Sequence, residues 1–127
     1  NFIITSNSPY YDWRSPQNNN LWQGVNGVNN PCPAGYRLPT VAELNAERLS
    51  WSSNNSAGAY GSPLKLPLAG LRNYSDGSLR SVGSDGYYWS STVSGTNSRL
   101  LYFFSSNAYL NSYHRAYGVS VRCTKDY

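Results

Sequence analysis

The alternation of apolar and polar residues predicts short β-strands in the second half of the chain. Five segments carry strand-like patterns, at residues 64–71, 79–82, 87–93, 99–104 and 119–124. Clusters of Ser, Asp and Gly predict turns between them, at 75–77, 84–86 and 94–95. Pro67 restricts its strand to an edge or a bulge, because proline lacks a backbone N–H. Residues 1–23 are predicted to form a short strand followed by a polar loop.

A helix is predicted to begin after Thr40. Thr40 and Glu43 have the spacing of a capping box, in which each side chain accepts a hydrogen bond from a backbone N–H of the first turn. Residues spaced three and four apart give an inward-facing stripe over about two turns, namely Val41, Leu44, Arg48 and Leu49. Residues 51–62 are predicted to be a loop, because Ser, Asn and Gly dominate there.

The strand predicted at 99–104 is apolar on both faces. Its period of two sends Leu101 and Phe103 to one face, and Leu100, Tyr102 and Phe104 to the other. If Leu101 and Phe103 face the core, the other three side chains form an exposed apolar patch. On a monomer such a patch usually marks an interaction site.

The C-terminal third has the composition of a contact surface. Residues 86–123 contain six of the twelve tyrosines, and residues 102–117 contain no Lys, Glu, Gln, Met or Trp. Tyr, Asn and Ser recur there, as they do in binding loops. We expect residues 107–117 to form a loop anchored by Leu110. The alternative is that 102–117 holds an ordinary core strand and a polar loop.

The chain is long enough for one compact domain, residues 1–127, with a single core. Only 13% of the residues are charged, and Gly, Ser, Asn and Tyr are abundant, which favours a loop-rich extracellular fold. No apolar run approaches the roughly 20 residues that a bilayer span needs. The chain begins at Asn1 and not at Met, so we expect it to be the C-terminal domain of a longer protein.

The titratable residues form no pattern typical of an enzyme or a metal site. The ten basic residues give a formal charge of +4 but lie singly along the chain, which argues against nucleic-acid binding. His114 is the only histidine, and the six acidic residues show no pair for acid–base catalysis. We therefore expect no enzyme activity, no metal and no cofactor.

The two cysteines, Cys32 and Cys123, leave two alternatives open. A disulfide between them would close a loop of about 90 residues and would stabilise the domain by roughly 4 to 5 kcal/mol at most. The other alternative is a pair of buried free thiols in a cytosolic protein.

Four blocks of sequence, NNPCPAGYRLPTVAEL, LPLAGLRNYSDGSL, GYYWSST and RAYGVSVRC, resemble a known family. They resemble, in the same order, the Fibrobacter succinogenes major paralogous domain, which has a C-type lectin-like fold. The resemblance spans nearly the whole chain and implies an α+β domain with small twisted antiparallel sheets, one or two helices and long ordered loops. It also agrees with pairing of the two cysteines. Calcium is not implied, because the Glu-Pro-Asn, Gln-Pro-Asp and Trp-Asn-Asp tripeptides of calcium-dependent relatives are absent.

In bacterial and phage proteins with this domain, the C-terminal block resembles the variable region of diversity-generating retroelements, in which adenines of a template are randomised. The resemblance implies ten diversified, ligand-binding positions in this chain, all of them residue types that an Asn codon can reach by changes at its adenines alone. They are Tyr87, Leu100, Tyr102, Phe104, Tyr109, Asn111, Ser112, Tyr113, His114 and Tyr117.

Together these observations favour a recognition domain, at a bacterial cell surface or on a phage tail, that binds a protein or a glycan on another cell. Neither nucleic acid nor direct membrane insertion is expected, and a homo-oligomer formed through an upstream region is compatible with the hypothesis. The alternative is a structural module whose aromatic face is buried against a neighbouring domain or subunit.

Overall fold

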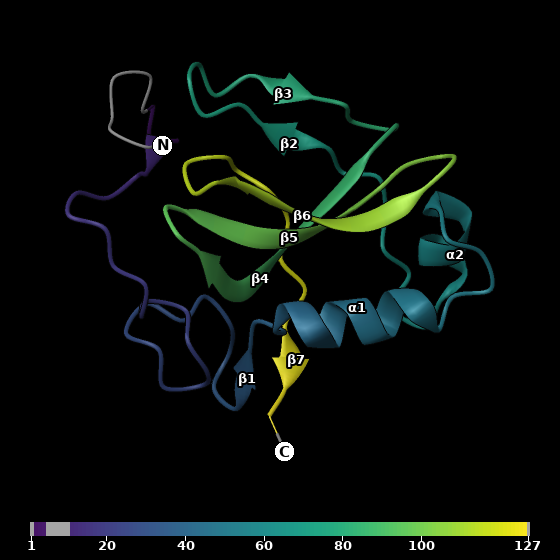
Figure 1. Cartoon of the computed structure of the whole chain (residues 1–127), viewed down its shortest axis with the longest axis horizontal. Helices are drawn as coiled ribbons and strands as arrows, with labels where there is room; N and C mark the ends of the chain where they lie inside the picture. The colour runs from purple at the N-terminus through teal and green to yellow at the C-terminus, as the bar shows by residue number, and fades with distance from the viewer. Residues whose placement is uncertain (1, 5–10, 127) are drawn as a thin grey trace.

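The structure is a computed structural model that describes residues 2–4 and 11–126. In this part of the chain the protein is α+β, with two helices and three small antiparallel sheets joined by long loops (Figure 1). The elements are β1 (Tyr36–Arg37), α1 (Val41–Leu49), α2 (Ser56–Gly61), β2 (Leu71–Arg72), β3 (Leu79–Arg80), β4 (Gly86–Ser94), β5 (Asn97–Phe103), β6 (Ala108–His114) and β7 (Thr124–Lys125). The coarse fold class predicted from the sequence is confirmed.

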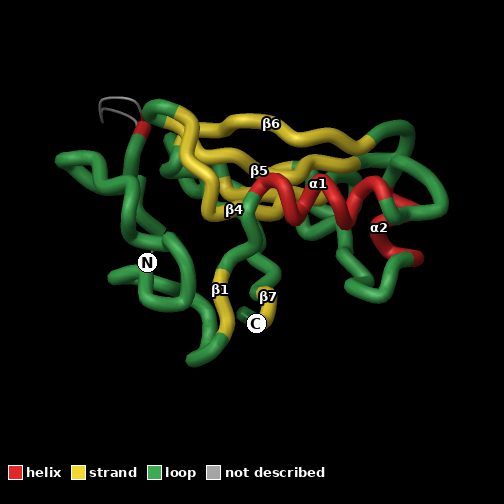
Figure 2. Tube along the Cα trace, turned by 60° about the horizontal axis from the view of Figure 1, so that its bottom comes forward, coloured by secondary structure: helices red, strands yellow, loops and turns green. Residues whose placement is uncertain are grey.

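The largest sheet has the strand order β4-β5-β6 and consists of two consecutive antiparallel hairpins. The turn between β4 and β5 contains Gly95, whose φ of 59° is the left-handed conformation that tight hairpin turns require. Figure 2 shows α1 in front of this sheet and the β1–β7 pair below it. The sheet therefore has one face toward the helices and one face toward the loops.

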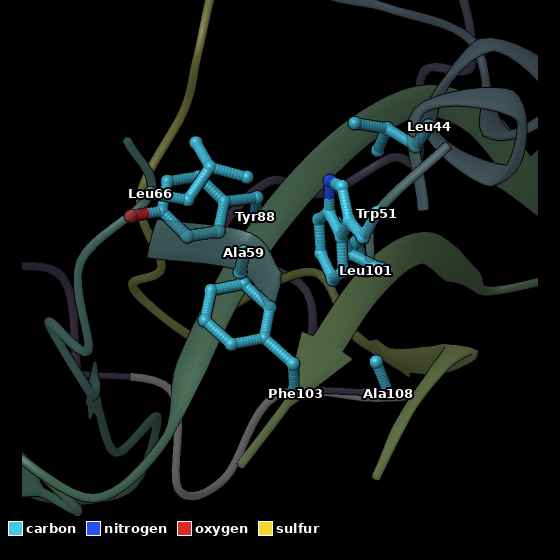
Figure 3. Packing of buried hydrophobic residues seen from close by; sticks show 8 residues of the cluster. All are labelled: Leu44, Trp51, Ala59, Leu66, Tyr88, Leu101, Phe103 and Ala108. Carbon is cyan, nitrogen blue, oxygen red and sulfur yellow. The ribbon is translucent and has the colours of Figure 1, made fainter. Parts of the chain in front are cut away.

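The face toward the helices carries the first hydrophobic cluster, which we call the helix-side core (Figure 3). Trp51 packs edge-on against Phe103, with ring centroids 5.7 Å apart. Gly86 lies opposite Phe103 in the sheet, and a Cβ at Gly86 would overlap the Phe103 ring. The buried members are Leu44, Trp51, Ala59, Leu66, Tyr88, Leu101, Phe103 and Ala108.

The opposite face carries a second cluster, the loop-side core, which consists of Leu38, Leu71, Tyr87, Trp89 and Leu100. Leu100 and Leu101 are both 0% exposed, so β5 is buried on both faces at this point. The expectation of an exposed patch at Leu100 is therefore wrong. Loops cover this face: the Trp89 N–H donates to the Ser120 carbonyl at 3.0 Å, and Val119 packs against the cluster.

Helix α1 begins with the predicted capping box. The Thr40 Oγ1 accepts from the Glu43 N–H at 3.2 Å, and the Glu43 Oε1 accepts from the Thr40 N–H at 2.9 Å. Leu44 is buried, as expected, but Leu49 is 68% exposed. Leu49 comes five residues after Leu44, which rotates its side chain about the helix axis by about 140° beyond one full turn. Leu49 therefore points away from the core that buries Leu44.

Helix α2 lies inside the segment predicted to be a loop. Asn55 caps it, and its Oδ1 accepts from the Gly58 N–H at 3.1 Å. Its six residues, SAGAYG, carry no apolar stripe, so nothing in the hydrophobic pattern predicted it. Ala59 is 0% exposed and packs into the helix-side core.

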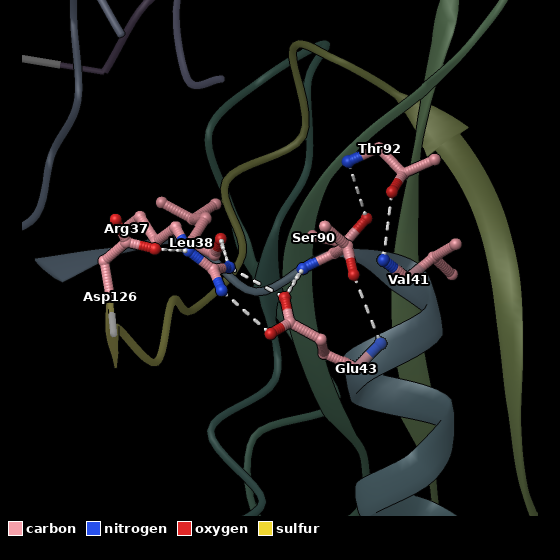
Figure 4. A network of polar contacts seen from close by, with 8 residues as sticks. Arg37, Leu38, Val41, Glu43, Ser90, Thr92 and Asp126 are labelled. Atoms are coloured by element: carbon pink, nitrogen blue, oxygen red, sulfur yellow. Dashed lines mark hydrogen bonds and ion pairs between the residues drawn. The ribbon is translucent and has the colours of Figure 1, made fainter. Parts of the chain in front are cut away.

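The N-terminal and C-terminal parts of the chain are joined below the sheet. Cys32 and Cys123 form a disulfide, as one of the two alternatives proposed, and β1 pairs with β7 beside it. Figure 4 shows Arg37 linking the two parts: it donates to Glu43 of α1 at 2.7 and 2.9 Å, and to Asp126 at 2.9 Å. The hydrogen bonds from the Arg37 side chain and the Thr40 N–H lower the pKa of Glu43 to about 2.

Several predicted strands are shorter in the structure. Residues 64–71, 79–82 and 119–124 contribute only to β2, β3 and β7. Leu64, Leu66, Leu68 and Val119 pack against the two cores from unpaired segments, whereas Leu79 and Val82 are exposed. Residues 2–4 form no strand, and the rest of residues 1–10 lies outside the described residues. The loop predicted at 107–117 is largely strand β6; its Asn and Ser content concealed the alternation of an edge strand.

Candidate functional site

The largest continuous aromatic feature of the described residues is a series of nine rings, which we call the ring chain. Neighbouring ring centroids lie 4.5 to 6.2 Å apart, a range in which aromatic pairs attract each other beyond simple burial. The members are Tyr11, Tyr74, Tyr87, Tyr102, Phe104, Tyr109, Tyr113, His114 and Tyr117. Seven of them are among the ten positions predicted from the sequence.

Three tyrosines form a row across the central sheet. Tyr87 lies opposite Tyr102, and Tyr102 lies opposite Tyr109, so the three rings meet on one face. The Tyr87 and Tyr102 rings stack with centroids 4.7 Å apart, and Tyr102 and Tyr109 lie 5.3 Å apart. Tyr87 is 5% exposed and Tyr109 is 38% exposed. The row thus runs from the loop-side core to the surface, and its buried ring supports its exposed one.

Asp85 lies at the side of this row, immediately before β4. Its Oδ2 accepts hydrogen bonds from the hydroxyls of Tyr87, at 3.2 Å, and Tyr102, at 3.0 Å. The sequence predicted only a turn at Asp85. The carboxylate is half-buried, so the row combines apolar ring faces with one negatively charged acceptor.

Tyr87 and Tyr102 of the row are neutral at physiological pH. Burial raises the pKa of Tyr102 to about 12, and the hydrogen bond to the Asp85 carboxylate contributes to the rise. Burial also raises the pKa of Tyr87, Tyr113 and Tyr117. These side chains therefore offer hydroxyl groups that donate and accept, and no charge.

The second half of the ring chain joins β6 to two other parts of the molecule. Tyr113 contacts Tyr87 at 5.6 Å and Tyr117 at 5.2 Å. Tyr117 contacts Tyr74 at 4.9 Å, and Tyr11 lies 4.5 Å from Tyr74. The β2–β3 turn and the N-terminal segment thus extend the surface that β6 begins. No signal in the sequence pointed to Tyr11 or Tyr74, because both come from segments predicted only as loop or turn.

Two predicted positions, Leu100 and Ser112, do not belong to the exposed ring face. Leu100 is fully buried. Ser112 points to the opposite face, where its Oγ accepts from Arg99 Nη1 at 2.9 Å. Asn111 lies on the ring face, but its Oδ1 accepts from the Ser112 N–H at 2.8 Å. The structure brings together the aromatic positions and separates the others.

Comparison with known families places most of this surface in one family domain. The family model described as Domain of unknown function (DUF8237) matches residues 48–124, which is more than half of the chain. The chain belongs to this family. The DUF8237 match contains every member of the ring chain except Tyr11, together with Asp85 and Cys123. No curated protein and no solved structure matches the chain.

The site offers contact chemistry: amphipathic rings, neutral hydroxyls and one carboxylate. Within the described residues, no group of three or more His, Cys, Asp or Glu side chains is placed to hold a metal ion. No helix in the described part is long and apolar enough to cross a membrane.

Proposed function

We propose that this protein is a recognition domain whose ring chain binds a protein or a glycan on another cell or surface. The observation that carries the proposal is the row of Tyr87, Tyr102 and Tyr109 beside Asp85. Its rings are held by stacking and by the sheet, so binding would restrict little additional side-chain motion. Rigid tyrosines give large contact area together with hydrogen bonding, which suits recognition better than catalysis.

We also propose that the fold is C-type lectin-like and that the surface is diversified by a retroelement. The small antiparallel sheets, the long loops and the Cys32–Cys123 disulfide support the fold, in agreement with the four sequence blocks that resemble that family. The aromatic members of the ten positions lie in contact with one another, as a shared binding surface requires. Diversification at Leu100 would have to retain an apolar side chain of similar size.

We infer that the domain works outside the cell, at a bacterial surface or on a phage tail. The support is the disulfide, since disulfides persist mainly in oxidising compartments.

The diversification hypothesis is tested by sequencing the DNA around the gene. A second copy of the segment that encodes residues 86–123, differing only at its adenines, would support a diversified surface. If no such copy exists, the surface is fixed and the retroelement part of the proposal is abandoned.

The binding hypothesis is tested with labelled domain and a panel of whole bacterial cells. Tyr109→Ala removes the most exposed ring of the row, and we expect at least a tenfold loss of binding to any cell that the unmodified domain labels. Tyr60→Ala is the matched control, because Tyr60 is 62% exposed on α2 and lies outside the ring chain. Equal effects of the two variants would contradict the proposal.

A structural module remains the alternative. Leu79 and Val82, 60% and 61% exposed, lie close to Tyr74 along the chain and favour a contact with another subunit. Sedimentation of the domain distinguishes the two: an oligomer that Leu79→Ser converts to a monomer would support the module.

A further inference from the structure

A pocket lies beside the ring chain and is lined by three tryptophans and an arginine. Two adjoining cavities share Trp13, Trp22, Trp89 and Arg115, and we call these four residues and the space between them the tryptophan pocket. The larger cavity has a volume of about 300 Å³ and an apolar lining that includes Phe2 and Val119. This volume lies at the lower end of the range for small-molecule sites.

The smaller cavity supplies polar groups. Its volume is about 50 Å³, and the amides of Asn18, Asn19 and Gln23 line it together with Ser91 and Ser98. The tryptophan pocket is therefore mainly apolar, with some hydrogen-bonding side chains at its smaller cavity. A ligand that fits it has an apolar face and hydroxyl groups, which is the character of a sugar ring.

The three indole rings are supported to different degrees. Trp89 is 4% exposed on β4, and Trp22 packs against the loop-side core. Trp13 is half-buried and belongs to neither core cluster of the described residues, although it lines both cavities. A hydrophobic core would not require Trp13 at this place, whereas a ligand platform would.

Arg115 provides a fixed positive charge at the junction of the two cavities. Its Nε donates to the Asn97 carbonyl at 3.3 Å, and its Nη2 donates to the carbonyls of Gly95 and Asn97 at 3.0 and 3.2 Å. These bonds hold the guanidinium against the β4–β5 turn. Within the described part of the chain, Nη1 donates to no acceptor.

The charge of Arg115 is partly desolvated, and burial lowers its pKa from an ordinary value far above neutrality. The acidic group that acts on it is Asp12, which is 7% exposed and does not line either cavity. A guanidinium in such a position binds a carboxylate more strongly than a neutral acceptor.

We propose that the tryptophan pocket binds an acidic sugar, such as a uronic acid residue of a surface polysaccharide. The apolar face of the pyranose stacks on the indole of Trp13, its hydroxyls bond the polar side chains of the smaller cavity, and its carboxylate binds Nη1 of Arg115. The net charge of +4 favours an anionic polymer. The proposal does not depend on ligand binding by the ring chain.

The test follows the four indole N–H resonances of the protein during titration with methyl β-glucuronide and, separately, methyl β-glucoside. The two probes share the pyranose and differ in the carboxylate. Trp51 is an internal control, because it lies in the helix-side core and donates to Glu47 at 3.2 Å. We expect saturable shifts at Trp13, Trp22 and Trp89 with the glucuronide, no shift at Trp51, and at least tenfold weaker binding of the glucoside.

Two variants and a charge control complete the test. Trp13→Ala and Arg115→Gln should each weaken glucuronide binding at least tenfold. Arg80→Gln removes the same charge from a side chain that is 54% exposed, and it should have no effect. If the NMR spectrum of Arg115→Gln loses its peak dispersion, that variant is unfolded. The binding measured for Trp13→Ala then decides whether the proposal holds.

Equal binding of both probes, or equal effects of the two arginine variants, would overturn the proposal, and so would the absence of saturable shifts. Tyr109→Ala should leave glucuronide binding unchanged, so the failure of this site and the failure of the ring chain are distinguishable.

Discussion

At the scale of single residues, two neighbours on one face of β5 have different surroundings. Leu100 lies between Trp89 and Asn111 in the sheet and is fully buried with Leu38 and Leu71. Tyr102, two positions further, is only half-buried, and its ring contacts other rings of the surface. The same apolar stripe therefore contains one core residue and one contact residue.

Replacing Leu100 with Ala should lower the free energy of unfolding by about 2 to 5 kcal/mol, because a fully buried leucine leaves a cavity. Leu49→Ala is the control; its side chain is 68% exposed, and we expect a change within about 0.5 kcal/mol. Urea denaturation measures both. A Leu100→Ala variant as stable as the control would show that the loop-side core is not formed as described.

Tyr102 should titrate far above an ordinary tyrosine. Its pKa of about 12 exceeds the ordinary value near 10, so its contribution to stability is complete below pH 10 and is lost as the pH rises from about 10 to 12. Asp85→Asn removes a negative charge and should lower the pKa of Tyr102, while burial still keeps it above 10. NMR of the tyrosine Cζ resonance measures this pKa, and an unchanged value in the variant would contradict the role of Asp85.

At the scale of elements, β6 is an edge strand with several of its outward backbone groups already satisfied. The Ala108 carbonyl accepts from Asn54 Nδ2 at 3.0 Å, and the Ser112 N–H donates to Asn111 Oδ1 at 2.8 Å. Such side-chain caps protect an exposed edge against pairing with another strand. Asn111 therefore has a structural role in addition to any role in binding.

Helix α2 has an unusual requirement for glycine. A Gly→Ala change inside a helix normally stabilises by about 0.5 to 1 kcal/mol, but a Cβ at Gly58 would overlap the Ser53 carbonyl oxygen. We expect Gly58→Ala to lower stability by about 1 to 3 kcal/mol. In Gly61→Ala the new Cβ has no atom within 4 Å, so its melting temperature should not fall. A stabilising Gly58→Ala would contradict the packing of α2 against residue 53.

At the scale of the whole molecule, three kinds of interaction join the segment at residues 32–37 to the C-terminal end of the described chain. The disulfide links residues 91 positions apart, β1 pairs with β7, and Arg37 forms ion pairs with Glu43 and Asp126. Cys32 packs against the loop-side core, and Tyr102, Tyr113 and Tyr117 of the ring chain pack against the same cluster. The disulfide and that surface therefore share one core.

Reduction of the disulfide should lower the free energy of unfolding by at most about 4 to 5 kcal/mol, because the unfolded chain regains the freedom of a loop of that length. Thermal denaturation with and without reductant measures the change. Cys32→Ala with Cys123→Ala should reproduce the reduced state without reductant. Equal melting temperatures of the oxidised and reduced protein would show that the β1–β7 pair and the ion pairs hold the ends together by themselves.

The local chemistry of the sequence was sufficient to predict several elements of the fold. The capping box and most of the β4 and β5 strands follow from side chains a few residues apart, and the structure has them close to where they were predicted. Such features depend on contacts within one element, so a pattern of residue types determines them.

The extent of burial and the assembly of the site depend on contacts between distant segments. Leu100 is covered by Leu38, by Leu71 of β2 and by the segment at Val119, and Tyr11, Tyr74 and Asp85 join the tyrosines of the sheet from distant segments. Local residue patterns account for a tyrosine-rich, weakly charged domain with a capped helix and a hairpin. Which of its apolar faces stays open to a ligand depends on which loops pack across the sheet, and no local pattern encodes that packing.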